Sequence, residues 1–156
     1  MRFIYLEALI ILIFVSILLF FKTVPNFRFC GPQVFSKQEL TVNNSVLIVQ
    51  KAETSCELQQ GLMNVKKISN DGMLFVFEEE SIKTFWMKNT LIPLSIAFID
   101  QSGVIIDIQD MEVEQTTNES EMKRYQSKSP AKYALEVNIG FFKDKNIKVG
   151  DQFIIP

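Results

Sequence analysis

Histidine is missing from this sequence of 156 residues, and cysteine occurs only twice. Without histidine, the chain cannot build a Ser-His-Asp triad, a Cys-His pair or a histidine-bearing zinc site. The two cysteines exclude a four-thiolate metal site, and they do not form a Cys-x-x-Cys motif. We therefore expect no metal, no cofactor and none of the familiar sets of catalytic residues.

The sequence also has no excess of positively over negatively charged residues. The 16 Lys and Arg residues and 18 Asp and Glu residues leave a net charge of −2. Proteins that bind nucleic acid neutralise its phosphates with surplus Lys and Arg, so we expect no nucleic-acid partner. The length suits one ordinary domain plus an appendage.

The N-terminus nearly lacks charge, because Phe3–Phe21 is apolar apart from Glu7 and Ser16. As a helix, residues 4–21 would span roughly 27 Å, close to the thickness of a hydrocarbon core. The residues that follow do not offer the small side chains that signal peptidase requires. A retained, single-pass membrane anchor over residues 1–22 is therefore favoured over a cleaved signal peptide or a buried helix.

Residues 23–37 contain Pro25, Gly31 and Pro32 without a sustained period and are interpreted as a tether. Residues 38–156 are interpreted as the folded domain. Positive charges flank the anchor on both sides, so they signal its orientation only weakly. The length of the domain favours its export, and we expect a membrane protein whose soluble domain lies outside the cytoplasm.

The domain consists of short β-branched segments separated by turn signals. Strands are expected over residues 46–49, 72–77, 95–100, 104–108, 133–137 and 153–155, the third and fourth forming a hairpin. One short helix is expected after Thr54, which forms a capping box with Glu57, and Gly61 ends it. This pattern predicts an all-β fold, a compact β-sandwich or barrel with one short helix, preceded by the transmembrane helix.

Two polar stretches are expected at the surface. The acidic run Glu78–Glu80 is interpreted as a solvated turn in preference to a cation site. Residues 112–129 have no apolar period in their polar part and are interpreted as a long exposed loop. Outside the cytoplasm two cysteines can pair, and the sequence leaves open whether Cys30 and Cys56 do so.

Residues 85–100 hold the single tryptophan of the sequence. In an extended conformation Trp86 and Lys88 share one face, and Asn89 joins them only if the strand breaks there. Trp86 offers a flat face for stacking on a sugar or a cation, and Glu136 is a carboxylate in an otherwise apolar strand. Trp86, Lys88, Asn89 and Glu136 are the predicted ligand-binding residues. The alternatives are that Trp86 is a core anchor and that Glu136 faces solvent or pairs with Lys88.

Several blocks of the domain resemble, in order, those of a known family. They are Gly61-Leu62-Met63, Asp71–Phe75, Phe85–Leu94, Tyr133–Glu136 with Gly140, and Gly150-Asp151. The family is the one called domain of unknown function 192, and the resemblance covers roughly residues 54–155. It implies a compact β-sandwich, often exported or membrane-tethered, with no agreed reaction. Where the family has an Arg and an Asp, this chain has Leu58 and Ser95, so a site that used those two charges is altered here.

Together these observations predict a membrane-anchored extracytoplasmic domain that binds a polar cell-envelope ligand or a partner protein. One alternative is an enzyme that uses Glu136 or Asp100 as a general base, with Lys88 as its electrostatic partner. The other is a structural envelope protein without a small-molecule site.

Overall fold

The computed structural model describes residues 30–156. The chain divides into two compact units, residues 1–31 and residues 32–156, and only Cys30 and Gly31 of the first unit are described. The expected membrane anchor over residues 1–22 and the first part of the expected tether lie outside the described residues. Within residues 30–156, no helix has the length and apolar character needed to cross a membrane.

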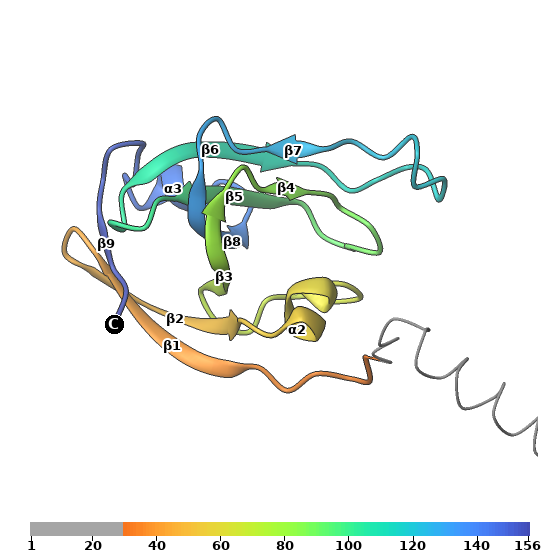
Figure 1. Ribbon diagram of the computed structural model, residues 1–156, viewed down its shortest axis with the longest axis horizontal. Coiled ribbons are helices and arrows are strands. Elements are labelled where there is room, and N and C mark those ends of the chain that lie inside the picture. The colour runs from red at the N-terminus through yellow and green to blue at the C-terminus, as the bar shows by residue number, and fades with distance from the viewer. Residues whose placement is uncertain (1–29) are drawn as a thin grey trace, which may run out of the picture. The chain divides into compact units, whose positions relative to one another are not determined.

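The described part of the chain is mostly β, as the sequence predicts (Figure 1). Its strands are β1 (Ser36–Val42), β2 (Ser45–Ala52), β3 (Gly72–Ser81), β4 (Thr84–Phe85), β5 (Leu94–Ile99), β6 (Ile105–Met111), β7 (Tyr125–Gln126), β8 (Ala131–Asn138) and β9 (Phe153–Ile154). Its helices are α2 (Ser55–Gln60) and α3 (Phe141–Asp144). The predicted hairpin is confirmed, since β5 and β6 pair antiparallel.

Seven of the described strands form one curled sheet, a half-barrel, in the order β6-β5-β8-β3-β2-β1-β9. The pair β2–β3 is parallel, whereas the other neighbours in the sheet are antiparallel. Parallel neighbours need a crossover connection, and the crossover between β2 and β3 carries α2. Strands β4 and β7 pair with each other as a separate two-stranded ribbon.

The two edges of the curled sheet meet at one end. Val104 forms a β-bridge with Gln152, and the N–H of Phe153 donates a hydrogen bond of 2.8 Å to the carbonyl of Gly103. Gly103 has a φ of +84°, and a Cβ there would lie 2.3 Å from the carbonyl oxygen of Phe153. This closing turn therefore requires glycine, for its positive φ and for the close approach of the two edges.

Both faces of the central strands are buried, and each carries a hydrophobic core. One core includes Leu40, Leu47, Leu74, Leu135, Val137 and Phe153. The other includes Met73, Phe75, Ile96, Phe98, Met111 and Ala134. Successive strand residues point to opposite faces, so on β8 Leu135 and Val137 belong to the first core and Ala134 to the second. By the same alternation, Glu136 points toward the second core.

The predicted capping box is confirmed at the start of α2. The Thr54 hydroxyl accepts a hydrogen bond of 3.3 Å from the N–H of Glu57, and the Glu57 carboxylate accepts one of 2.9 Å from the N–H of Thr54. Gly61 follows the helix with a φ of +45° and donates its N–H to the carbonyl of Glu57. Two otherwise unpaired N–H groups are thereby satisfied at the helix start, which explains how so short a helix is stable.

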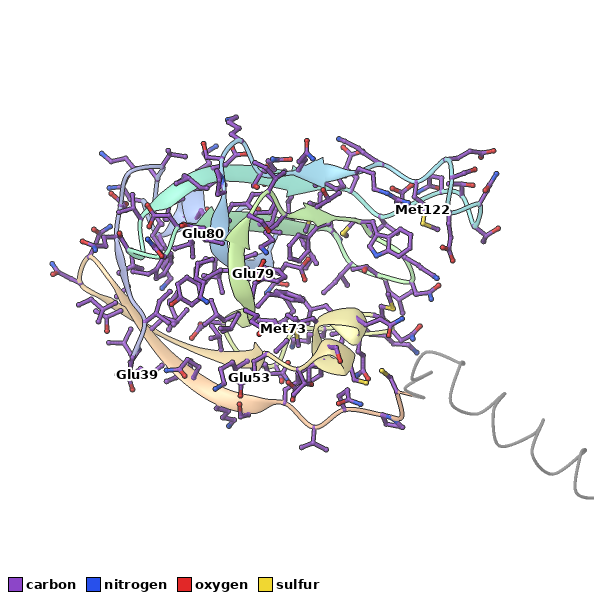
Figure 2. All side chains as sticks on the ribbon, in the orientation of Figure 1. Glu39, Glu53, Met73, Glu79, Glu80 and Met122 are labelled. Carbon is purple, nitrogen blue, oxygen red and sulfur yellow. The ribbon has the colours of Figure 1, made fainter. Side chains whose placement is uncertain are left out.

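The acidic run Glu78–Glu80 does not form the predicted turn. It belongs to β3, where Glu78–Glu80 are exposed, whereas Met73 near the start of the strand is buried. Figure 2 labels Glu79, Glu80 and Met73. Beyond a bulge, Ser81 still pairs with Ala131 of β8, and this pairing keeps the acidic residues extended.

Two further segments differ from the sequence interpretation. Strand β1, which the sequence did not predict, begins at Ser36, inside the stretch interpreted as a tether. Residues 112–129 are not wholly exposed, because Met122 and Tyr125 are buried and Tyr125 pairs with Phe85 across the ribbon. Single buried residues in a polar stretch have no period, so their long-range partners could not be recognised.

The question about the cysteines is answered by the structure. Cys30 and Cys56 are each disulfide-bonded, and no cysteine within residues 30–156 is free. They are the two cysteines of the sequence.

Candidate functional site

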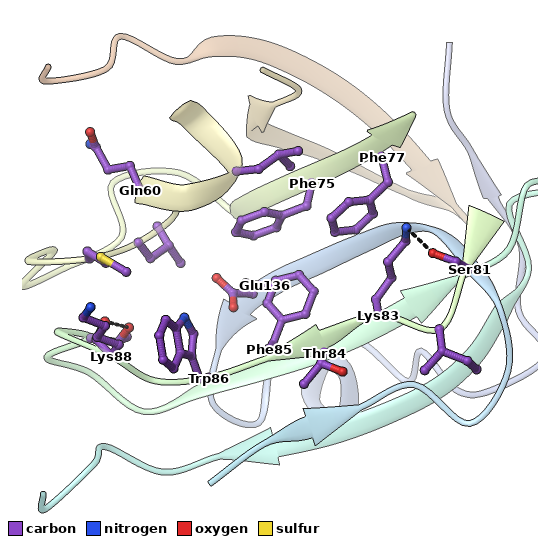
Figure 3. Close-up of a pocket in the computed structure, with 15 residues that line it drawn as sticks. Gln60, Phe75, Phe77, Ser81, Lys83, Thr84, Phe85, Trp86, Lys88 and Glu136 are labelled. Atoms are coloured by element: carbon purple, nitrogen blue, oxygen red, sulfur yellow. Dashed lines mark hydrogen bonds between the residues drawn. The ribbon is translucent and has the colours of Figure 1, made fainter. Parts of the chain in front are cut away.

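A pocket of about 320 Å³ is formed by α2, β3, the β4 segment and the central strand β8 (Figure 3). Its apolar wall includes Leu58, Leu62, Phe75, Phe77 and Phe85. Trp86, Lys88 and Glu136, three of the four predicted site residues, also line it, whereas Asn89 does not.

Glu136 lies on β8 between Met73 of β3 and Ile96 of β5 and is 5% exposed. Burial raises the pKa of its carboxyl group from 4.5 to about 8, because the charged form loses its hydration. Within residues 30–156, no side chain forms a hydrogen bond or an ion pair with this carboxyl group. Glu136 therefore neither faces solvent nor pairs with Lys88, the two alternatives left by the sequence.

Gly72 lets β3 lie close to β8 at this position. A Cβ at Gly72 would stand 2.3 Å from the carbonyl oxygen of Glu136 and 2.8 Å from the side chain of Val137. A larger residue would push the two central strands apart and displace Glu136. The glycine that opens β3 thus positions the carboxylate.

Aromatic rings build the wall beside Glu136. The Phe75 and Phe85 rings meet edge to face at 5.0 Å, and Phe85 also contacts Phe77 at 6.1 Å and Phe98 at 5.8 Å. Such pairs prefer this perpendicular geometry because the ring edge is positive and the face negative. Figure 3 shows the Glu136 carboxyl group in the space bordered by Phe75, Phe85 and Trp86.

Trp86 is half-buried, and two cationic side chains of the protein, Lys88 and Arg124, lie over its ring. The Lys88 Nζ lies 5.1 Å and the Arg124 Cζ lies 4.3 Å from its ring centroid. Lys88 forms an ion pair with Glu119, and Arg124 donates a hydrogen bond of 2.9 Å to the Glu119 carbonyl. These contacts of Glu119 and Arg124 hold the long connection between β6 and β7 beside Trp86.

Lys83 is a pocket residue that the sequence did not identify. Its Nζ donates hydrogen bonds of 2.8 Å to the Glu79 carbonyl and to the Ser81 hydroxyl, and it lies 4.3 Å from the centroid of the Phe77 ring. Burial lowers the pKa of this ammonium group. No local motif announces this role, because β3 and β4 bring Lys83 to the pocket only in the folded chain.

Asn89 belongs to a turn and not to the pocket. It is exposed, has a φ of +53°, and its carbonyl accepts a hydrogen bond of 2.8 Å from the N–H of Asn64. The strand ends earlier than the sequence suggests, because β4 stops at Phe85, before Trp86, and the break does not lie at Asn89. Met87 is buried at 1% exposure, whereas Phe85 is only partly buried.

Asp100 lies in the hairpin turn. Its carboxylate accepts hydrogen bonds of 2.8 Å and 2.9 Å from the N–H groups of Ser102 and Val104, and it does not line the pocket. Asp100 is therefore a turn residue, and the enzyme hypothesis is left with Glu136 alone as a base.

The two departures from the resembled family lie in different places. Leu58 adds apolar surface to the pocket. Ser95 is buried elsewhere, where its hydroxyl donates a hydrogen bond of 2.6 Å to Asp110 and accepts one of 3.0 Å from the N–H of Gly140. Within residues 30–156, no three His, Cys, Asp or Glu side chains gather as a metal site.

Comparisons with known proteins agree with this architecture. The profile of the family described as Uncharacterized ACR, domain of unknown function 192, matches residues 38–155. A crystal structure of a candidate transcription regulator from Sinorhizobium meliloti 1021 is similar at 29% identity and a TM-score of 0.71, over 80% of this chain and 98% of that one. A protein of unknown function from Novosphingobium aromaticivorans DSM 12444 is similar at 27% identity and a TM-score of 0.67, over 80% of this chain and 92% of that one. No curated protein matches the chain.

Proposed function

We propose that this chain, which belongs to the family called domain of unknown function 192, is a membrane-anchored extracytoplasmic binding module. Its ligand is a small polar compound of the cell envelope, held in the pocket beside Trp86 and Glu136. The family carries no activity in its description, so the proposal stands on the chemistry of the pocket.

The observation that carries the proposal is the unpaired carboxyl group of Glu136 at the pocket. Burying a carboxyl group without a hydrogen-bond partner costs folding free energy, and an apolar residue at this place would avoid that cost. Glu136 as a whole residue is 5% exposed, and it borders a pocket of about 320 Å³, which is large enough for a small organic molecule. A ligand with a complementary polar group satisfies the carboxyl group, and the aromatic wall contributes apolar contact.

The extracytoplasmic location has two supports. Disulfides persist mainly in oxidising compartments, and both cysteines of the chain are disulfide-bonded. The apolar stretch Phe3–Phe21 has the length of a membrane span. Mass spectrometry of chain purified from membranes tests the anchor, because peptides from residues 1–22 must then be present.

The Sinorhizobium protein is described as a candidate transcription regulator, but the charge of this chain does not favour DNA binding. The net charge of −2 provides no surplus of Lys and Arg for DNA phosphates.

Trp86 makes the binding test direct, because it is the single tryptophan of the chain and lines the pocket. The full-length chain is titrated with N-acetylated sugars, amino sugars, amino acids and short peptides while its tryptophan emission is recorded. A saturable change with at least one of these compounds is expected.

A matched pair of variants then locates the binding. Thr84 is exposed and lines the pocket, whereas Gln126, directly opposite on β7, is exposed and does not. Thr84→Tyr is expected to weaken binding at least tenfold, and Gln126→Tyr to preserve it. No saturable signal from any compound, or equal effects of the two variants, would contradict the proposal.

An enzymatic function is the second candidate, and one observation favours it. The pKa of Glu136 is raised to about 8, near the range where a carboxyl group works as a general acid or base at neutral pH. Lys88, the partner expected from the sequence, is engaged with Glu119. Turnover of a bound compound that Glu136→Gln abolishes without loss of binding would favour the enzyme over the binding module.

A further inference from the structure

Three ionisable side chains line the pocket, and two of them already have partners. The Lys83 ammonium group donates to Glu79 and Ser81, and the Lys88 ammonium group is paired with Glu119. Only Glu136 has no partner for its ionisable group among residues 30–156. Glu136 is therefore the ionisable group of the pocket that a ligand can pair with, and its charged form calls for a positive charge.

The surroundings of Glu136 suit such a charge. Phe75, Phe85 and Trp86 border its carboxyl group, and aromatic rings attract cations through their negative faces (Figure 3). Trp86 already lies against the cationic ends of Lys88 and Arg124, at 5.1 Å and 4.3 Å from its centroid. The wall thus combines a carboxylate with rings of the kind that bind ammonium groups.

Other ligand classes fit this arrangement less well. An anion would meet the Glu136 carboxyl group, and both lysine ammonium groups already donate hydrogen bonds within the protein. A neutral sugar could donate hydroxyl hydrogen bonds to Glu136, but it supplies no counter-charge, and an ion pair is strengthened where water is excluded. The Glu136 carboxyl group therefore favours a cation over an anion or a neutral sugar.

We infer that the ligand of this pocket is a small organic cation, a protonated primary amine or a quaternary ammonium compound, whose ammonium group pairs with Glu136 against the aromatic wall. The inference rests on the proposed binding function and specifies its ligand class. It also makes binding depend on ionisation, because the cation pairs with the charged form of the carboxylate.

The affinity for a cation is expected to change with pH in a definite direction. In the free protein the pKa of Glu136 is about 8, so most molecules are protonated at pH 7, and binding a cation releases up to about one proton. The other ionisable side chains lining the pocket are Lys83, after β3, and Lys88, after β4; α2 contributes only uncharged side chains. Affinity for a cation therefore rises as pH increases toward 8.

The test uses the full-length chain with choline and its neutral counterpart of the same shape, 3,3-dimethylbutan-1-ol. Calorimetric titration at pH 7 in phosphate and in MOPS, a zwitterionic buffer whose ionisation enthalpy differs from that of phosphate, counts the protons released. Choline is expected to bind at least tenfold more tightly, with release of more than half a proton. Glu136→Gln keeps the shape of the side chain and is expected to reduce the preference for choline to less than threefold. Glu39→Gln, an exposed change on β1, is expected to retain it.

The outcomes separate the two proposals. Equal affinity for choline and the alcohol, or binding of neutral sugars alone, overturns the cation inference and leaves the binding function intact. A choline preference that survives in Glu136→Gln also overturns it. If no compound of any class binds, the binding function itself fails and the cation inference fails with it.

Discussion

Glu136→Gln removes the ionisable group of the pocket that has no partner among residues 30–156, while it keeps the shape of the side chain. In the folded protein the pKa of Glu136 is about 8, against 4.5 for the ordinary carboxyl group that the unfolded chain presents. Between these two values the folded state binds more protons than the unfolded state, so the free energy of unfolding falls as pH rises. The stability associated with the protonated carboxyl group is fully present below pH 4.5 and is lost as pH rises to about 8.

The size of the effect follows from the two pKa values. A tenfold change in proton affinity corresponds to about 1.4 kcal/mol, so the interval from 4.5 to about 8 amounts to about 5 kcal/mol. Water that enters the pocket when the group ionises reduces this figure. Between pH 4.5 and pH 8.5, we expect the free energy of unfolding of Glu136→Gln to rise by about 3–5 kcal/mol relative to that of the original chain, because glutamine stays neutral throughout.

Urea unfolding of both proteins across this pH range measures the difference directly. Groups that titrate in both proteins cancel when the two curves are subtracted. Glu39→Gln, which changes an exposed carboxylate on β1, serves as the control and should give a nearly flat difference. The difference in free energy of unfolding, Glu136→Gln minus the original chain, should rise with pH. A difference that stays flat or falls with pH would refute the assignment of a buried, unpaired carboxyl group.

Three further predictions concern the closure of the sheet, the capping box and the role of Trp86. In urea unfolding, Gly103→Ala should lower the free energy of unfolding by at least about 2 kcal/mol more than Gly140→Ala. Both positions have φ near +80°, but only at Gly103 would a Cβ meet a carbonyl oxygen, at 2.3 Å. Equal losses in the two variants would contradict the sheet closure. Thr54→Ala should cost about 1 kcal/mol through loss of the capping box, measured by thermal unfolding, and an unchanged midpoint would contradict it. Trp86→Ala should cost less than about 2 kcal/mol and Phe98→Ala about 3–5 kcal/mol, since Phe98 is fully buried and Trp86 is not; similar losses in urea would make Trp86 a core anchor.

Local signals account for the elements that the sequence predicts well. The capping box at Thr54 needs only a neighbour three residues away, and the hairpin of β5 and β6 needs only a short turn. Strand β1 was missed because Ser36–Val42 carries charged and polar residues on its exposed face, with Leu40 and Val42 as its buried residues. Its identity comes from pairing with β2 and β9, and β9 lies at the other end of the domain.

Some residues of the candidate site can likewise be identified from local sequence, and others cannot. Trp86 and Lys88 are neighbours in one short segment, and Glu136 was conspicuous as a carboxylate in an apolar strand, so all three were identified from the sequence. Lys83 was missed because its place depends on the course of the chain after β3, including the bulge that β3 makes against β8. Arg124 was missed because a polar loop gives no sign of which aromatic ring it will cover.

The closure of the sheet also determines when folding can finish. Residues 150–154 hold the start of β6 and pair with the outer edge of β1, yet they are synthesised after every other strand. A nascent chain that has not reached them offers unpaired N–H and C=O groups at both places to neighbouring molecules. The domain can therefore complete its fold only after these residues have left the ribosome, and copies truncated before them carry two strand edges open to aggregation.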